Sequence, residues 1–173
     1  TFHETPNIDR LAAQGMRFTD AYAACPVCSP TRASIMSGQY PARVGITDFI
    51  PGHQRPWAKL LVPVNRQQYL PLEIITIPEA LKAAGYVSGA FGKWHLGGRE
   101  YYPDRQGFDE IVVSDGRHFN FSTFPATQVK ETDYLAEVLT GHAERFLEAH
   151  AAEPFFLYLS HFAVHIPLEA RQE

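Results

Sequence analysis

Residues 25–38 read Cys-Pro-Val-Cys-Ser-Pro-Thr-Arg-Ala-Ser-Ile-Met-Ser-Gly, and they predict a helix with a nucleophile at its start. Ser29 is a good N-cap, and Gly38 is a favoured C-terminal stop. Cys28 would lie just before the helix N-terminus, where free backbone N–H groups and the helix dipole favour negative charge. Arg32 would follow within the first turn and add a cation. The stretch therefore predicts a nucleophile that faces an anionic substrate.

Outward from this helix, the pattern of apolar residues alternates between helix and strand. It predicts helices at residues 6–14, 76–84 and from 132 onward, and strands at residues 16–23, 86–91 and 155–160. Residues 41–75 and 98–131 have little periodicity and are predicted to be long loops. The alternation predicts an α/β fold with a mainly parallel (mixed) sheet flanked by helices.

Chemistry-bearing residues follow each of the three predicted strands. Ligands of open α/β sheets bind beyond the carboxyl ends of the strands. Cys28 and Arg32 follow the first strand, Lys93 and His95 follow the second, and His165 follows the third. Three separate segments thus bring a nucleophile and several cationic groups to one sheet edge, which predicts an anion-processing pocket.

The other histidines and the loop carboxylates have weaker signals. His161 also follows the third strand, and the sequence leaves open whether it contacts a ligand, supports a neighbour or is structural. The remaining histidines are predicted at the surface or in loops: His3, His53, His118, His142 and His150. His118 could alternatively reach a substrate, because Asp115 lies close to it in the sequence. Three loop carboxylates are predicted to be solvated: Asp104, Asp109 and Asp115.

The composition of the chain excludes some classes of protein and favours others. The 173 residues are 45% hydrophobic, which is enough for one domain with a sizeable core. The net charge of −4 argues against a nucleic-acid-binding surface. No apolar run is long enough to predict a membrane span. The chain begins with Thr, so we expect the natural start to lie upstream.

Cys25 and Cys28 form a Cys-x-x-Cys pair, which is typical of redox and zinc sites. A zinc site needs a second ligand pair, and no later cysteine exists. We expect Cys25 to be a small buried apolar residue. Two cysteines leave the redox compartment open.

Five stretches together resemble the signatures of one enzyme family, and they occur in that family's order. They are Cys-Ser-Pro-Thr-Arg (28–32), Met-Ser-Gly-Gln-Tyr-Pro-Ala-Arg-Val-Gly (36–45), Phe-Gly-Lys-Trp-His-Leu-Gly (91–97), Gln-Gly-Phe-Asp (106–109), and Pro-Phe-Phe-Leu-Tyr-Leu-Ser (154–160) followed by His-Ile-Pro-Leu (165–168). The chain thereby resembles the formylglycine-dependent sulfatases of the alkaline-phosphatase-like superfamily. One departure is Thr31, where Ser or Ala is commoner, and it should leave the turn undisturbed.

The resemblance implies hydrolysis of organic sulfate esters, as in arylsulfatases. A separate maturation enzyme would oxidise Cys28 to formylglycine (3-oxoalanine), whose hydrate attacks sulfur and forms a covalent sulfate intermediate. Arg32 and His95 would hold this residue during catalysis, and Lys93 and His165 would contact the sulfate. A Ca²⁺ ion would polarise the sulfate, with Cys28 as its only ligand within this chain.

The resemblance also implies that residues 1–173 are an internal piece, a partial N-terminal catalytic domain. The family's metal-binding Asp pair would lie upstream, and the C-terminal portion would lie downstream. We expect the piece alone to be inactive or nearly so. Its substrate would be a small-molecule or carbohydrate sulfate ester, and residues 46–72 and 98–130 would shape the substrate pocket. The compartment implied is periplasmic, secreted or lysosomal.

Three other functions stay open at this point. A phosphonate or phosphate monoester hydrolase of the same superfamily could use the same signature. A non-catalytic, degenerate relative is a second alternative, against which the intact set of site residues speaks. A redox or zinc protein built on Cys25 and Cys28 is a third, and it leaves the stretches around Lys93, His95 and His165 unexplained.

Overall fold

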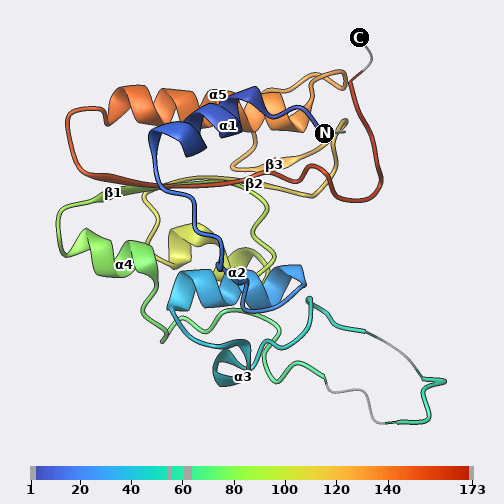
Figure 1. Ribbon diagram of the computed structural model, residues 1–173. Helices are drawn as coiled ribbons and strands as arrows, with labels where there is room; N and C mark the ends of the chain where they lie inside the picture. The colour runs from blue at the N-terminus through green and yellow to red at the C-terminus, as the bar shows by residue number, and fades with distance from the viewer. Residues whose placement is uncertain (1–2, 54–55, 61–63, 172–173) are drawn as a thin grey trace.

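The computed structural model describes residues 3–53, 56–60 and 64–171, and its centre is a four-stranded sheet in the order β3-β2-β1-β4 (Figure 1). The strands are β1 (Val87–Gly92), β2 (Glu110–Ser114), β3 (Thr123–Phe124) and β4 (Phe155–Ser160). β1 pairs in parallel with both β2 and β4, and β3 runs antiparallel to β2. The predicted mainly parallel, mixed sheet is confirmed, as are the strands predicted at 86–91 and 155–160.

Helices cover both faces of the sheet. The long helix α5 (Leu135–Ala149) packs on one face, and α2 (Cys28–Ser37) and α4 (Ile77–Lys82) lie on the other (Figure 1). α5 presents Leu135, Leu139 and Phe146 to the apolar cluster around Phe91. α2 contributes buried residues to a second cluster on its own side of the sheet, which includes Trp94. The two clusters together hold β1 rigidly between two apolar layers.

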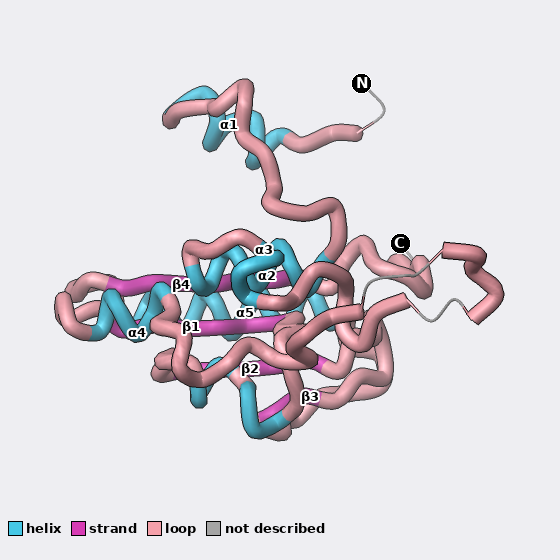
Figure 2. The backbone as a smooth tube through the Cα atoms, turned by 90° about the horizontal axis from the view of Figure 1, so that it is seen from below, coloured by secondary structure: helices cyan, strands magenta, loops and turns pink. Residues whose placement is uncertain are grey.

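The strand predicted at residues 16–23 is wrong. The helix before it, α1 (Pro6–Gln14), forms as predicted but buries none of its residues. Residues 16–23 are exposed, have no strand structure, and project with α1 away from the sheet (Figure 2). Alternating apolar residues form a strand only when a neighbouring strand takes up their backbone hydrogen bonds. No strand of the described residues lies beside this segment.

The two predicted loops contain structure that the sequence pattern did not indicate. Residues 41–75 include the single-turn helix α3 (Pro41–Val44). Residues 98–131 include the 3₁₀ turns η1 (Arg99–Tyr101) and η2 (Pro103–Arg105), and also β2 and β3. β2 is a short apolar run, and such a run becomes a strand through pairing with a neighbour rather than through periodicity of its own.

Helix α5 begins later than predicted. Tyr134, not Thr132, precedes its first turn. The backbone N–H of Lys130 donates to Oδ2 of Asp133 at 2.8 Å, and the N–H of Asp133 donates to the carbonyl of Lys130 at 3.0 Å. Residues 130–133 are therefore closed into a turn of their own, which places Thr132 outside the helix.

Within the described part of the chain, no helix has both the length and the apolarity needed to cross a membrane.

Candidate functional site

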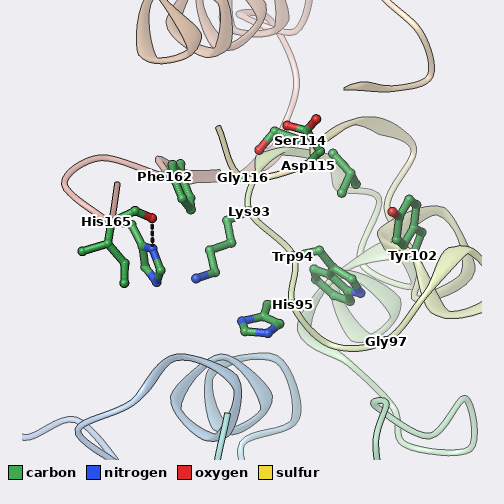
Figure 3. A pocket seen from close by; sticks show the side chains of 12 residues that line it. Lys93, Trp94, His95, Gly97, Tyr102, Ser114, Asp115, Gly116, Phe162 and His165 are labelled. Carbon is green, nitrogen blue, oxygen red and sulfur yellow. Dashed lines mark hydrogen bonds between the residues drawn. The ribbon is translucent and has the colours of Figure 1, made fainter. Parts of the chain in front are cut away.

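Three of the predicted site residues line one cavity at the carboxyl ends of β1 and β4. Lys93 and His95 follow β1, and His165 follows β4, so parallel pairing of the two strands brings them together. Their side chains converge from different segments on the same space (Figure 3). The cavity measures about 300 Å³, and residues such as Tyr102 and Asp115 line its opposite wall. Cys28 and Arg32 adjoin it through His95 and Lys93 rather than lining it.

Cys28 is the first residue of α2, and its Sγ atom lies 3.2 Å from Nδ1 of His95. The predicted N-cap is wrong by two residues, because Val27 precedes the helix and Ser29 lies inside the first turn. The Ser29 hydroxyl is buried and accepts a hydrogen bond from the backbone N–H of Ile50 at 3.1 Å. Gly38 ends the helix as predicted, with φ of 66°.

His95 is held from both ring nitrogens. Nε2 lies 2.6 Å from the carbonyl oxygen of Ile50, which can only accept a hydrogen bond, so Nε2 carries a proton. In the neutral ring Nδ1 is then the acceptor that faces Cys28. Burial lowers the pKa of His95 below 6.5, the Ile50 hydrogen bond opposes this, and Lys93 and Arg32 lower the pKa further. His95 is therefore a neutral proton acceptor beside the cysteine.

The backbone of His95 is in the left-handed region, with φ of 60°. This conformation is uncommon for residues other than glycine and asparagine and costs free energy. It turns the imidazole back toward the N-terminus of α2 instead of along the continuing chain. The strain is thus tied to the position of the proton acceptor.

Arg32 was predicted in the first turn of the helix, but because α2 begins at Cys28, Arg32 is its fifth residue and lies in the second turn. Its guanidinium reaches the sheet. Its Nη1 donates to the carbonyl of Lys93 at 2.8 Å, to the hydroxyl of Tyr158 at 3.1 Å, and to Oγ of Ser160. The N–H of Lys93 in turn donates to the carbonyl of Ser160 at 2.8 Å. Arg32 therefore ties α2 to the ends of both β1 and β4.

Lys93 is the half-buried cation of the cavity. Its Nζ lies 5.7 Å from the centre of the Phe162 ring. Burial lowers the pKa of Lys93, the Cys28 sulfur opposes this, and Arg32 lowers the pKa further. An anion bound in the cavity would favour the charged form of Lys93, because it would offset the nearby positive charge of Arg32.

His165 completes the cavity from the segment after β4. Its Nδ1 lies 2.8 Å from the carbonyl of Ile166 and therefore carries a proton, so the neutral ring keeps Nε2 as an acceptor (Figure 3). Its ring lies on that of Phe162, with 4.8 Å between the centres. Its main-chain carbonyl accepts a hydrogen bond from Nε2 of His118 at 2.9 Å.

His118 was predicted at the surface or in a loop; it lies in a loop, but it is buried rather than superficial. Only 2% of its surface is exposed, and its ring packs against Tyr134 and Phe162. The short segment around it has no periodic pattern, so only the aromatic residues that follow it, Phe119 and Phe121, hinted at burial.

The other histidines lie outside the cavity. His161 lines a separate surface hollow with Glu137, Thr140 and Glu144. His53 pairs with Asp48 at 2.5 Å and is exposed, as predicted. His142 and His150 are half-buried rather than superficial, against Phe91 and Phe146.

The three loop carboxylates are exposed, as predicted, and each has a polar partner, although Asp115 also lines the cavity. Asp104 pairs with Arg99, Asp109 with Lys82, and Asp115 accepts hydrogen bonds from Ser122. Cys25 and Cys28 are both free thiols. Cys25 is half-buried rather than fully buried, and its carbonyl accepts a hydrogen bond from the Thr31 hydroxyl. The hydroxyl of Thr31 therefore stabilises the turn before α2, which agrees with the expectation that Thr31 leaves this turn undisturbed.

The described residues do not by themselves fit a metal ion. Ca²⁺ takes six to eight oxygen ligands. Within residues 3–53, 56–60 and 64–171, no group of three or more His, Cys, Asp or Glu side chains could hold a metal. The arrangement offers instead a nucleophile position, a neutral proton acceptor and cations for a tetrahedral anion.

Comparisons with known proteins show which family the chain is similar to. The family model described as Sulfatase matches residues 1–173. N-acetylgalactosamine-6-sulfatase from Sus scrofa is 34% identical over 96% of this chain and 36% of its own length. Arylsulfatase A from Homo sapiens is 47% identical over 62% of this chain and 20% of its own length.

Solved structures show the same fold. The crystal structure of Ps i-CgsB in complex with k-i-k-neocarrahexaose has a TM-score of 0.77 and 30% identity, over 96% of this chain and 41% of that one. The structure of BT4656 in complex with its substrate D-glucosamine-2-N,6-O-disulfate has a TM-score of 0.69 and 29% identity, over 94% of this chain and 30% of that one. The chain thus spans about a third of the length of the curated relatives that match nearly all of it, 36% for the porcine protein.

Proposed function

Because the chain belongs to the sulfatase family, we propose that it carries the nucleophile and part of the anion pocket of an enzyme that hydrolyses organic sulfate esters. The observation that supports this best is the position of Cys28. It opens a helix, lies 3.2 Å from a neutral histidine, and adjoins a cavity that contains Lys93 and His165. A nucleophile in this position would meet a sulfate held by Lys93 and His165.

We propose further that Cys28 is the precursor of formylglycine and that its thiol stands where the hydroxyls of the hydrated aldehyde would stand. When formed, this group supplies a hydroxyl nucleophile on a carbon that bears a second hydroxyl. The surroundings of the thiol suit such a group, since Nδ1 of His95 is an acceptor at hydrogen-bond distance and the N-terminus of α2 tolerates negative charge.

His95 would take the proton of the attacking hydroxyl. Its Nε2 is bound to the Ile50 carbonyl, so the free lone pair is on Nδ1, which faces the nucleophile position. The lowered pKa keeps the ring neutral and ready to accept. Arg32 would hold this arrangement through the Lys93 carbonyl and β4 rather than by touching the sulfate.

Lys93 and His165 would bind the sulfate inside the cavity that they line. The Lys93 ammonium supplies a half-buried positive charge, which is stronger in a partly desolvated site than in water. The leaving alcohol needs a proton, and His165 would donate it from Nε2 in its imidazolium form, while Nδ1–H stays on the Ile166 carbonyl.

The calcium ion implied by the resemblance would be held mainly by residues other than those described here. The described residues contain no cluster that could ligate it, and the steps above use none of its chemistry. We accordingly propose that residues 1–173 form part of a larger catalytic domain and have little or no activity alone.

For the substrate we propose a carbohydrate sulfate ester. One relative is named for N-acetylgalactosamine-6-sulfate chemistry, and two solved structures contain a neocarrahexaose and a sulfated glucosamine. The wall that carries Tyr102 and Asp115 belongs to residues 98–130 and offers an aromatic ring and a carboxylate to such a sugar.

The decisive test is made on the complete protein, produced in a host that has the formylglycine-generating enzyme. Mass spectrometry of the tryptic peptide of residues 18–32 should show Cys28 converted to the aldehyde. Matched sulfate and phosphate esters of the same phenol should then be compared. We expect faster turnover of the sulfate; an unmodified thiol or faster turnover of the phosphate contradicts the proposal, and the latter supports the phosphatase alternative.

A further inference from the structure

His118 is a buried polar residue that the proposed reaction does not use. Only 2% of it is exposed, and aromatic rings lie on both of its sides, with centre distances of 4.8 Å to Phe162 and 6.1 Å to Tyr134. Its own main-chain carbonyl accepts a hydrogen bond from the N–H of Leu135 at 2.8 Å, at the start of α5. A buried imidazole is costly unless its N–H groups find partners, so its hydrogen bond has a structural purpose.

That hydrogen bond goes to the main chain of His165. Nε2 of His118 lies 2.9 Å from the His165 carbonyl oxygen, and because a carbonyl only accepts, the ring nitrogen is the donor. The two histidines also share Phe162, whose ring centre lies 4.8 Å from each imidazole. His118, 47 residues away in the sequence, thus holds the main chain of His165, while the Phe162 ring packs against both imidazoles.

The segment that carries His165 has no regular secondary structure, and its other attachments are the buried Phe162 ring in the cluster around Phe91 and the ion pair of Arg171 with Glu137. Residues 161–171 contain no helix or strand, and His165 itself is exposed. Its N–H donates to the Phe162 carbonyl at 3.0 Å, which closes a local turn but does not attach that turn to the rest of the domain. Attachment through the His165 carbonyl comes from His118, which the start of α5 fixes in turn.

We propose that His118 is a positioning residue for His165: its Nε2–H fixes the main chain of the segment after β4 so that the His165 ring faces Lys93 across the cavity. The catalytic role of His165 in this inference rests on the proposed function. The placement of its main chain by His118 does not depend on that function. The donor acts on the main-chain oxygen of His165, 2.9 Å from Nε2, and the His118 ring packs against Tyr134 and Phe162.

The test uses two variants of the complete protein that separate the donor from the packing. His118→Phe keeps an aromatic ring between Tyr134 and Phe162 but removes the N–H. His118→Gln places an amide nitrogen near the position of Nε2 and keeps the donor. We expect His118→Phe to lower kcat/KM for an aryl sulfate about 10–100-fold, as misplaced or unsupported catalytic groups do. We expect His118→Gln to recover most of that loss.

A double-mutant cycle shows whether the effect passes through His165. In a His165→Ala background, His118→Phe should cause little further loss of kcat/KM, because the group that it positions is gone. An equal loss in both backgrounds overturns the proposal, as does full activity of His118→Phe. If His118→Phe fails to fold, His118→Met, which also removes the N–H, takes its place in both backgrounds, and an equal loss in the two backgrounds overturns the proposal.

A crystal structure of His118→Phe separates failure of this inference from failure of the proposed function. A displaced His165 carbonyl and ring supports the positioning role, even if the wild-type protein proves to have no sulfatase activity. An unmoved His165 overturns the role, whatever the enzyme hydrolyses.

Discussion

The Sγ atom of Cys28 lies 3.2 Å from Nδ1 of His95, although 67 residues separate the two in the chain. This contact joins the start of α2 to the loop after β1, across the face of the sheet that α5 does not cover. Because the Ile50 carbonyl holds the proton of His95 on Nε2, the contact has a direction, and the sulfur side is the donor when the ring is neutral.

Replacement of His95 should abolish most catalysis without unfolding the protein. Asparagine tolerates the left-handed backbone conformation that His95 adopts, so His95→Asn should fold, but it has no titratable acceptor. In the complete, matured protein we expect kcat to fall about 10²–10⁴-fold. His53→Asn is the matched control, since His53 pairs with Asp48 away from the cavity. Comparable losses in both variants would contradict the role of His95.

The pH dependence should follow the lowered pKa of His95. Burial disfavours the imidazolium, so kcat/KM should hold as the pH falls through 6.5 and decline only below that value. The stability of the folded protein should also fall at acidic pH. The unfolded chain binds the proton at higher pH than the folded one, so stability from this residue is lost as the pH falls below 6.5. An acidic limb at or above 6.5, or one that persists in His95→Asn, would disagree with this assignment.

Arg32→Lys should lower both stability and activity although it keeps the charge. An ammonium cannot reproduce the guanidinium contacts with the Lys93 carbonyl, Tyr158 and Ser160. We expect a loss of about 1.5–3 kcal/mol in the free energy of unfolding, measured by urea denaturation, from the hydrogen bonds to a charged group. Arg105→Lys, on an exposed side chain, serves as the control and should change little. An unchanged urea midpoint for Arg32→Lys would refute the bridging role.

Gly92→Ala should be far more damaging than Gly98→Ala. A Cβ atom at Gly92 would lie 2.0 Å from the carbonyl oxygen of Ser160, at a φ of 115°, whereas a Cβ at Gly98 meets nothing within 4 Å. Strain and overpacking together should cost about 3 kcal/mol or more at Gly92. Thermal melting of the two variants compares them directly. Equal melting temperatures would show that β1 and β4 can separate at this end.

The sequence allowed prediction of the parts of the fold that short-range patterns specify. The 86–91 and 155–160 strands, α1 and the Gly38 stop all have local signals, and the structure confirms them. β2 and the 16–23 segment were misjudged for one reason, since pairing partners decide whether a short apolar run becomes a strand.

The sequence allowed us to predict which residues gather at the candidate site, but not which hydrogen bonds they make. Lys93, His95 and His165 could be placed together because they follow strands that were predicted to be parallel. Arg32 turned toward the sheet and His118 proved buried, and neither could be inferred from spacing. Such contacts depend on three-dimensional packing between segments far apart in the chain, which no local periodicity encodes.

The carbonyl of Ile50 sets the tautomer of His95, yet it belongs to an irregular loop and not to the sheet. What this loop must keep is a path of the main chain rather than a particular side chain, because every residue has a carbonyl. Position 50 should therefore tolerate many apolar residues, while insertions or deletions on either side of it should be excluded. The length of this loop, together with the Asn65 side chain that accepts hydrogen bonds from the N–H groups of Thr47 and Asp48, constrains the proton acceptor.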